Sequence, residues 1–100
     1  MTFTMSANPT ARSDVFTEYL ADGSVVIFDP ITSVAHELNA TAALVWDCCD
    51  GSYDFQKIVA ALEECFASSS EISTAKIKED VTYFLQVLQQ KNLLVSPLSI

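Results

Sequence analysis

Residues 34–49, VAHELNATAALVWDCC, are the most informative stretch of the sequence, because the spacing of their apolar residues changes from two to three and four. The first five residues alternate between two faces, and a period of two is typical of a β-strand with one buried side. One face carries Val34, His36 and Leu38, and the other carries Ala35 and Glu37. Asn39 follows, and asparagine is favoured before the first turn of a helix because its side chain accepts a hydrogen bond there. The stretch therefore predicts a half-buried strand that leads directly into a helix.

This helix is predicted to run from Ala40 to about Cys49. Its apolar residues recur at intervals of three and four, and they are Ala42, Val45, Trp46 and Cys49. Leu44 and Cys48 form a second apolar edge, which covers much of the remaining circumference. Gly51 supplies the left-handed residue that ends the helix. A helix that is apolar on most sides is expected to lie centrally in the domain.

Two short runs upstream are rich in β-branched and aromatic residues, Phe16–Leu20 and Val25–Asp29. Asp22-Gly23 lies between them, and Asp-Gly is the commonest signal of a two-residue hairpin loop. Asp29-Pro30 breaks the second run, because proline cannot donate to a strand ladder. These patterns predict a hairpin that is followed by the strand over 34–38.

Two further helices are predicted downstream. Asp54 can cap the first, whose apolar stripe consists of Phe55, Ile58, Val59, Leu62, Cys65 and Phe66. Residues 67–70 are predicted to form a loop. Ser73 can cap the last helix, Asn92 suits its C-terminal end, and its core face consists of Ile77, Val81, Phe84, Leu85 and Leu88. The predicted fold class is α+β, with a three-stranded antiparallel sheet followed by three helices.

The 100 residues are enough for a single domain with one core. We expect residues 1–14 to form a flexible N-terminal arm, residues 15–95 the domain and residues 96–100 a C-terminal tail. The net charge of −8 disfavours nucleic acid and anionic membranes as partners, because both attract lysine and arginine. The sequence shows neither a signal peptide nor an apolar run long enough to span a membrane. A soluble, cytoplasmic protein is therefore expected.

The chemistry-bearing residues form no catalytic pattern. No constellation of nucleophile and carboxylate is spaced around the single histidine, His36, so we interpret it as a packed strand residue. The three cysteines contain no C-x2-C pair, so neither a zinc site nor a disulfide framework is indicated, and small core residues are the simpler interpretation. A thiol-redox pair of Cys48 and Cys49 is the alternative, and it requires an accessible thiolate of low pKa. The expectation is a protein without enzymatic activity, cofactor or metal.

Residues 36–46, HELNATAALVW, followed by Cys49-Asp50-Gly51, resemble the core pattern of the PqqD family of pyrroloquinoline quinone biosynthesis proteins. Residues 55–62, FQKIVAAL, are similar to the second helix of that family. Its third helix and end are matched by Ile72-Ser73, Asp80-Val81, Phe84-Leu85 and Leu93-Leu94. The resemblance covers about residues 15–95 and extends around Trp46 to stand-alone lasso-peptide recognition proteins. Asp54 and Ser73-Thr74 depart from the usual Thr and Asp-Pro, yet both keep a capping side chain.

The resemblance implies a winged helix-turn-helix-like domain that recognises the leader of a ribosomally made precursor peptide. In such proteins the leader adds as a strand to the edge of the third strand and lies in a groove against the third helix. A partner enzyme, which is a radical SAM protein or a leader peptidase, then acts on the held peptide. The implied peptide-binding residues are Val34, Ala35, His36, Glu37 and Leu38 on the strand, and Lys76, Asp80, Tyr83, Phe84 and Val87 on the helix.

The residues themselves allow this mechanism and leave alternatives open. A sheet of three short strands leaves edges with unpaired N–H and C=O groups, where a peptide can dock or two copies of the chain could pair as a homodimer. On the last predicted helix a second stripe runs beside the core face and consists of Lys76, Asp80, Tyr83 and Val87. This stripe could wall a groove, or it could instead be an ordinary solvated helix face. A winged-helix DNA-binding regulator shares this arrangement of elements, but it would be expected to carry lysine or arginine where Glu79 and Asp80 lie.

Overall fold

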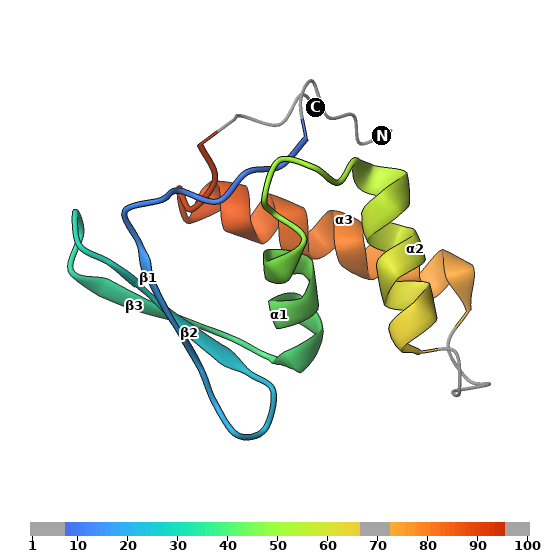
Figure 1. The fold of residues 1–100 in the computed structure, drawn as a ribbon, viewed down its shortest axis with the longest axis horizontal. Coiled ribbons are helices and arrows are strands. Elements are labelled where there is room, and N and C mark those ends of the chain that lie inside the picture. The colour runs from blue at the N-terminus through green and yellow to red at the C-terminus, as the bar shows by residue number, and fades with distance from the viewer. Residues whose placement is uncertain (1–7, 67–72, 96–100) are drawn as a thin grey trace.

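The computed structural model describes residues 8–66 and 73–95 (Figure 1). Three strands come first, β1 (Phe16–Tyr19), β2 (Val25–Asp29) and β3 (Val34–Leu38). They are followed by α1 (Ala40–Asp47), α2 (Phe55–Cys65) and α3 (Thr74–Gln90). The predicted α+β order is confirmed. The predicted loop at 67–70 and the predicted tail at 96–100 lie outside the described residues.

The strands form one antiparallel sheet in the order β1-β2-β3, so β1 and β3 are its edges. The predicted hairpin is present, but its loop has three residues rather than two, because the Leu20 amide donates to the Ser24 carbonyl (2.9 Å) across residues 21–23. Gly23 closes this loop with a φ of 88°, the left-handed conformation that three-residue hairpin loops require at their last position. The aspartate of the Asp-Gly pair accepts the Ser24 amide instead of sitting in a two-residue turn.

All three helices begin at the caps that the sequence predicts. The side chains of Asn39, Asp54 and Ser73 each accept a hydrogen bond from a backbone amide in the first helical turn. Helix α1 ends at Asp47, two residues earlier than predicted, because the Cys48 and Cys49 amides tighten the last turn by bonding three residues back. The capping residues thus fix where β3 stops and where each helix starts.

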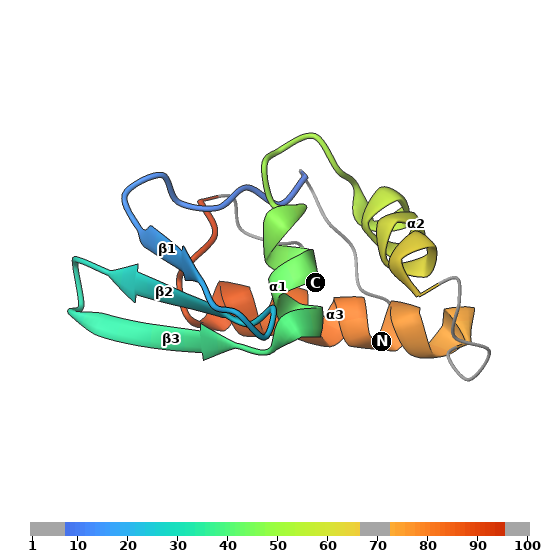
Figure 2. The same ribbon diagram turned by 60° about the horizontal axis from the view of Figure 1, so that its bottom comes forward.

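The core lies between one face of the sheet and the three helices (Figure 2). Along β2, Val25, Ile27 and Asp29 are buried, whereas Phe28 points outward. The predicted core faces of α2 and α3 are largely confirmed, with Ile58, Leu62, Val81 and Leu85 almost fully buried. Cys65 is a correction, because it is exposed rather than part of the core. It is the last residue of α2.

Strand β3 is more exposed than its alternating pattern predicts. Leu38 is buried and His36 half-buried, but Val34 is 45 % exposed although it lies on the same face. The strand enters the core only where it approaches α1, and its first residues extend beyond the helices (Figure 2). β3 therefore presents most of its length to solvent.

Residues 8–14, which the sequence places in a flexible arm, pack against the domain. Pro9 is buried, the Ala11 amide donates to the Cys49 carbonyl (2.8 Å) and the Arg12 amide donates to the Leu93 carbonyl (2.9 Å). The Val95 amide donates to the Thr10 carbonyl (2.8 Å) from the other side. This segment, here called the strap, joins the end of α1 to the chain after α3. The prediction of an arm over 1–14 is therefore wrong for residues 8–14, and residues 1–7 lie outside the described ranges.

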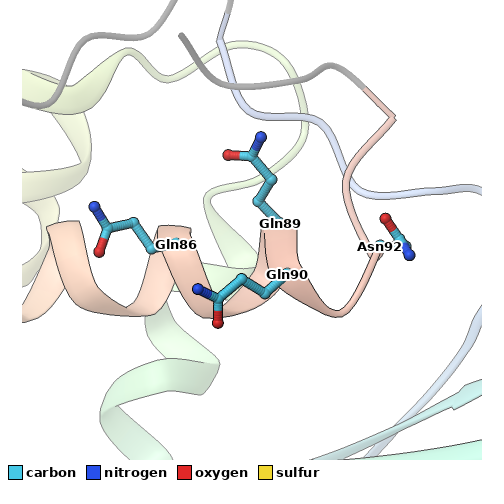
Figure 3. A pocket seen from close by; sticks show the side chains of 4 residues that line it. All are labelled: Gln86, Gln89, Gln90 and Asn92. Carbon is cyan, nitrogen blue, oxygen red and sulfur yellow. The ribbon is translucent and has the colours of Figure 1, made fainter. Parts of the chain in front are cut away.

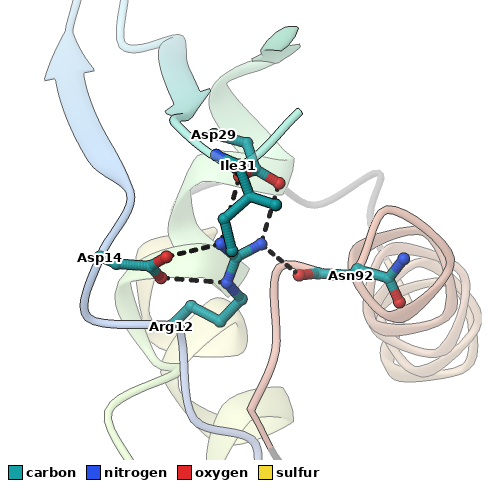
Figure 4. Close-up of polar contacts among 5 residues, drawn as sticks. All are labelled: Arg12, Asp14, Asp29, Ile31 and Asn92. Carbon is teal, nitrogen blue, oxygen red and sulfur yellow. Dashed lines mark hydrogen bonds and ion pairs between the residues drawn. The ribbon is translucent and has the colours of Figure 1, made fainter. Parts of the chain in front are cut away.

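Arg12 of the strap connects the sheet to the end of α3 (Figure 4). Its guanidinium donates to both carboxylate oxygens of Asp29 at 2.8 and 3.1 Å, and to the Asn92 carbonyl at 3.0 Å. Two more hydrogen bonds join it to Asp14. These contacts hold the pKa of both carboxyls below the usual value, because the arginine stabilises their charged forms. One side chain thereby links the β2–β3 turn to the segment after α3.

Candidate functional site

The outer edge of β3 carries main-chain groups that the sheet does not use. In an antiparallel sheet, alternate residues of a central strand form main-chain hydrogen bonds to opposite neighbours, and the bond between Leu20 and Ser24 shows which residues of β2 bond to β1. The main-chain groups of Val25, Ile27 and Asp29 accordingly point to β3, where their partners are Leu38, His36 and Val34. The N–H and C=O groups of Ala35 and Glu37 therefore point to the open edge.

A pocket of about 170 Å³ lies where this edge meets α3. It is lined by Glu37, Leu38, Asn39, Ala42, Tyr83, Phe84, Val87 and Lys91. A cavity of about 150 Å³ accommodates a benzene-sized group, whereas pockets for whole small molecules begin at about 300 Å³. The pocket thus has room for one large apolar side chain rather than for a separate small ligand.

Two aromatic side chains dominate the α3 wall of this pocket. The rings of Tyr83 and Phe84 meet edge to face with centroids 5.4 Å apart. Phe84 packs partly into the core, whereas Tyr83 is 60 % exposed. Because neighbouring core residues hold Phe84, the contact fixes the position of the exposed Tyr83 ring beside the strand edge.

The structure brings five of the ten predicted site residues into this pocket. They are Glu37 and Leu38 of β3 and Tyr83, Phe84 and Val87 of α3. The other three strand residues lie further along β3, beyond the pocket. Lys76 and Asp80 stand outside it, because Lys76 is seven residues before Tyr83, roughly 10 Å along the helix axis. They pair with each other at 3.0 Å instead.

Three lining residues were not predicted as site residues. Asn39 and Ala42 had been assigned to capping and to the core, and both roles are real. Lys91 was overlooked because it directly follows α3, although it lies four residues after Val87 on the same stripe. Extending that stripe by one helical turn would have found it. Lys91 is the one basic residue among those that line the pocket, in a chain of net charge −8.

A second cavity, of about 450 Å³, lies on another side of α3 (Figure 3). It is lined by the side chains of Gln86, Gln89, Gln90 and Asn92, all of which end in an amide. Amides can donate and accept hydrogen bonds, but this cavity has no aromatic side chain among its lining residues, whereas ligand pockets are typically lined by hydrophobic and aromatic side chains with few polar groups. The smaller pocket beside the β3 edge is therefore the better candidate site.

The two buried thiols of α1's last turn are unsuited to redox chemistry. Burial raises the pKa of the Cys48 thiol, and it raises the pKa of the Cys49 thiol to about 12. A reactive thiol needs a lowered pKa and access to solvent, whereas these two thiols have raised pKa values and are buried. Over residues 8–66 and 73–95, no group of three or more His, Cys, Asp or Glu side chains is arranged to hold a metal ion. No helix in the same ranges is long and apolar enough to cross a membrane.

Comparison with known proteins identifies the family. The model of the family described as coenzyme PQQ synthesis protein D (PqqD) matches residues 24–94, which include β2, β3, all three helices and the pocket. The chain belongs to the PqqD family. No curated protein matches the sequence significantly.

Two solved structures share the fold of this PqqD-family chain. One is described as TbiB1 in complex with the TbiA(beta) leader peptide, with a TM-score of 0.73 and 23 % sequence identity, covering 90 % of this chain and 99 % of that one. The other is described as lasso peptide synthetase B1 complexed with the leader peptide, with a TM-score of 0.69 and 19 % identity, covering 91 % and 100 %. At these identities the likeness establishes the common fold, and both neighbours span nearly the whole chain.

Proposed function

We propose that this chain binds the leader of a ribosomally made precursor peptide and presents it to a separate modifying enzyme. The observation that carries the proposal is the position of the pocket. It lies at the open edge of β3, so a peptide that adds as a fourth strand can place a side chain between Tyr83 and Val87. Strand addition of this kind takes affinity from the main chain and specificity from pockets.

The energetics require both parts of the site. Ala35 and Glu37 offer two donors and two acceptors, and each hydrogen bond contributes about 0.5 to 1.5 kcal/mol net. Ordering a disordered peptide costs about 2 to 5 kcal/mol, which offsets most of that gain. Burying one large apolar side chain in the pocket contributes about 1.5 to 3 kcal/mol more. Net affinity therefore depends on the pocket side chains as well as on the strand edge.

Two findings from the comparisons support the proposal. The family of the chain is named for a step in coenzyme PQQ synthesis, and both solved structures of the same fold were determined with a leader peptide. The charges agree with a peptide partner rather than with DNA. Arg12 and Lys76, two of the five basic residues, already pair with aspartates, which leaves little positive charge for phosphates.

In this function the partner enzyme, rather than this chain, modifies or cleaves the precursor peptide. The chain acts in the cytoplasm as a carrier without enzymatic activity of its own, and the enzyme is a radical SAM protein or a leader peptidase. The buried, high-pKa thiols of Cys48 and Cys49 support a non-catalytic role, since neither is suited to act as a nucleophile.

Calorimetric titration with the synthetic leader of the precursor encoded beside the chain tests this function. The parent is expected to bind, and Ala35→Pro and Glu37→Pro are each expected to weaken binding at least about tenfold, because proline removes a donor from the open edge. Circular dichroism should show that both variants remain folded, since neither residue donates to β2. Unchanged affinity in both folded variants would exclude strand addition at β3.

A further inference from the structure

We propose that the outer face of the sheet is the docking surface for the modifying enzyme, which meets it with an apolar pocket bordered by lysine or arginine. The inference rests on the proposed function, because it concerns the enzyme that receives the held peptide. It uses the side of the sheet that faces away from the helices, which the core does not use and which meets the peptide pocket only at Glu37 (Figure 2).

The outer face is defined by the strand register. Residues paired across strands share a face, and the buried Val25, Ile27 and Asp29 mark the inner one. The outer face consists of Phe16, Glu18, Val26, Phe28, Ala35 and Glu37. Its apolar residues line up, because Phe28 is paired with Phe16 on one side and with Ala35 on the other. We call these three the apolar row.

The apolar row is exposed to an unusual degree for aromatic residues. Phe16 is 66 % exposed and Phe28 39 % exposed, with ring centroids 6.4 Å apart. Two such rings leave roughly 200 Å² of apolar surface in water, taking about 200 Å² for a whole phenylalanine. Single exposed apolar residues are ordinary on a protein surface, whereas these two rings lie side by side and form one continuous apolar patch of modest size.

The residues beside the apolar row indicate which charge the partner should carry. Val26 is flanked across the sheet by Glu18 and Glu37, so the apolar row is bordered by two carboxylates on one side. A second copy of the chain would bring the same glutamates and a net charge of −8, and repulsion would oppose its approach. A partner with lysine or arginine around an apolar pocket satisfies both rows. The small area fits a transient encounter rather than a permanent dimer, which needs well over about 1,000 Å².

The position of the row suits an enzyme that acts on the bound peptide. The row ends at Ala35, whose main-chain groups face the open edge of β3. A peptide strand added there lies about 4.8 Å from β3. An enzyme seated on the outer face is thus one strand away from the peptide without covering the edge at which the peptide binds.

The test uses the peptidase or radical SAM enzyme encoded beside the chain, together with its own precursor leader. Phe16→Thr/Phe28→Thr removes the rings but keeps strand-forming residues, and Glu18→Lys reverses one charge without touching the core. Val95→Ser is the control, because Val95 is 55 % exposed but lies after α3, away from the sheet. Leader affinity and enzyme affinity are both measured by calorimetry, at about 50 and about 300 mM NaCl.

The double variant is expected to bind the enzyme at least about tenfold more weakly and the leader within about twofold of the parent. Glu18→Lys is expected to weaken enzyme binding at low salt and to flatten its salt dependence, while Val95→Ser behaves like the parent. Parental enzyme affinity in both the double variant and Glu18→Lys would overturn the inference. So would a parent dimer in sedimentation that the double variant dissociates, since a second copy would then occupy the face. A parent that does not bind leader would instead refute the proposed function.

Discussion

At the scale of single residues, burial separates the three thiols into two kinds. Cys48 and Cys49 are buried with raised pKa values, whereas Cys65 is exposed at the end of α2. At pH 8 the native chain is expected to react rapidly with a disulfide reagent at one thiol, and at all three after denaturation. Counting released thiolate measures this. Rapid reaction of three thiols in the folded protein would revive the redox interpretation of the vicinal pair.

Arg12 is the residue whose loss is expected to matter most outside the core. Arg12→Gln leaves the buried Asp29 carboxylate without its cation, and a buried charge that loses its partner is strongly destabilising. Lys76→Gln is the matched control, because it breaks an ion pair between an exposed lysine and a half-buried aspartate near the surface, and such a pair contributes little. Urea denaturation should give a clearly lower free energy of unfolding for Arg12→Gln than for Lys76→Gln. Equal values would mean that the strap is not held by this contact.

At the scale of elements, the α3 wall of the pocket is expected to govern leader affinity. Tyr83→Ala and Val87→Ala should each weaken leader binding about tenfold, or about 1.4 kcal/mol, because each removes apolar surface from the pocket. Gln86→Ala is the control on the same helix, since its side chain lines the amide cavity instead. Calorimetry decides the affinities, and thermal melting should show that the variants remain folded. Parental affinity in both pocket variants would remove α3 from the site.

Local chemistry explains why the elements could be predicted and the strap could not. Asn39, Asp54 and Ser73 act on amides within three residues, so their signals are complete in the sequence. The strap is held by main-chain bonds to residues some 40 to 80 positions away, such as those from Ala11 to Cys49 and from Arg12 to Leu93. Main-chain bonds leave no side-chain periodicity, and Arg12 by itself gives no sign of its partners.

In the candidate site, too, local spacing could be predicted from the sequence and long-range packing could not. The α3 stripe follows from helical spacing, and two of its residues, Tyr83 and Val87, line the pocket together with the neighbouring Phe84. Spacing alone also included Lys76 and Asp80, because helical spacing does not say where a stripe ends, whereas neither residue lines the pocket. Which part of a helix faces another element is a property of tertiary packing, and the sequence pattern does not contain it.

At the scale of the whole molecule, the strap contact makes stability depend on pH in the acid range. The pKa values of Asp29 and Asp14 are lowered in the folded state, first of all by the hydrogen bonds from Arg12. Their contribution is complete above the unfolded pKa, near 3.9, and is lost as pH falls through the lower folded values. The free energy of unfolding is therefore expected to fall below about pH 4, and less steeply in Asp29→Asn. Denaturant titrations from neutral pH to about pH 3 measure both slopes, and parallel slopes would contradict this assignment.

In the proposed complex, a leader peptide becomes the fourth strand of the sheet at the edge of β3. Amide hydrogen exchange followed by NMR, with and without the leader of the neighbouring precursor, can show whether this strand forms. Binding is expected to protect the amides of Ala35 and Glu37, which face the open edge, and to change His36 much less, because its amide already faces β2. Saturating leader that leaves Ala35 and Glu37 exchanging as in the free protein, or that protects the edge of β1 instead, would contradict the account.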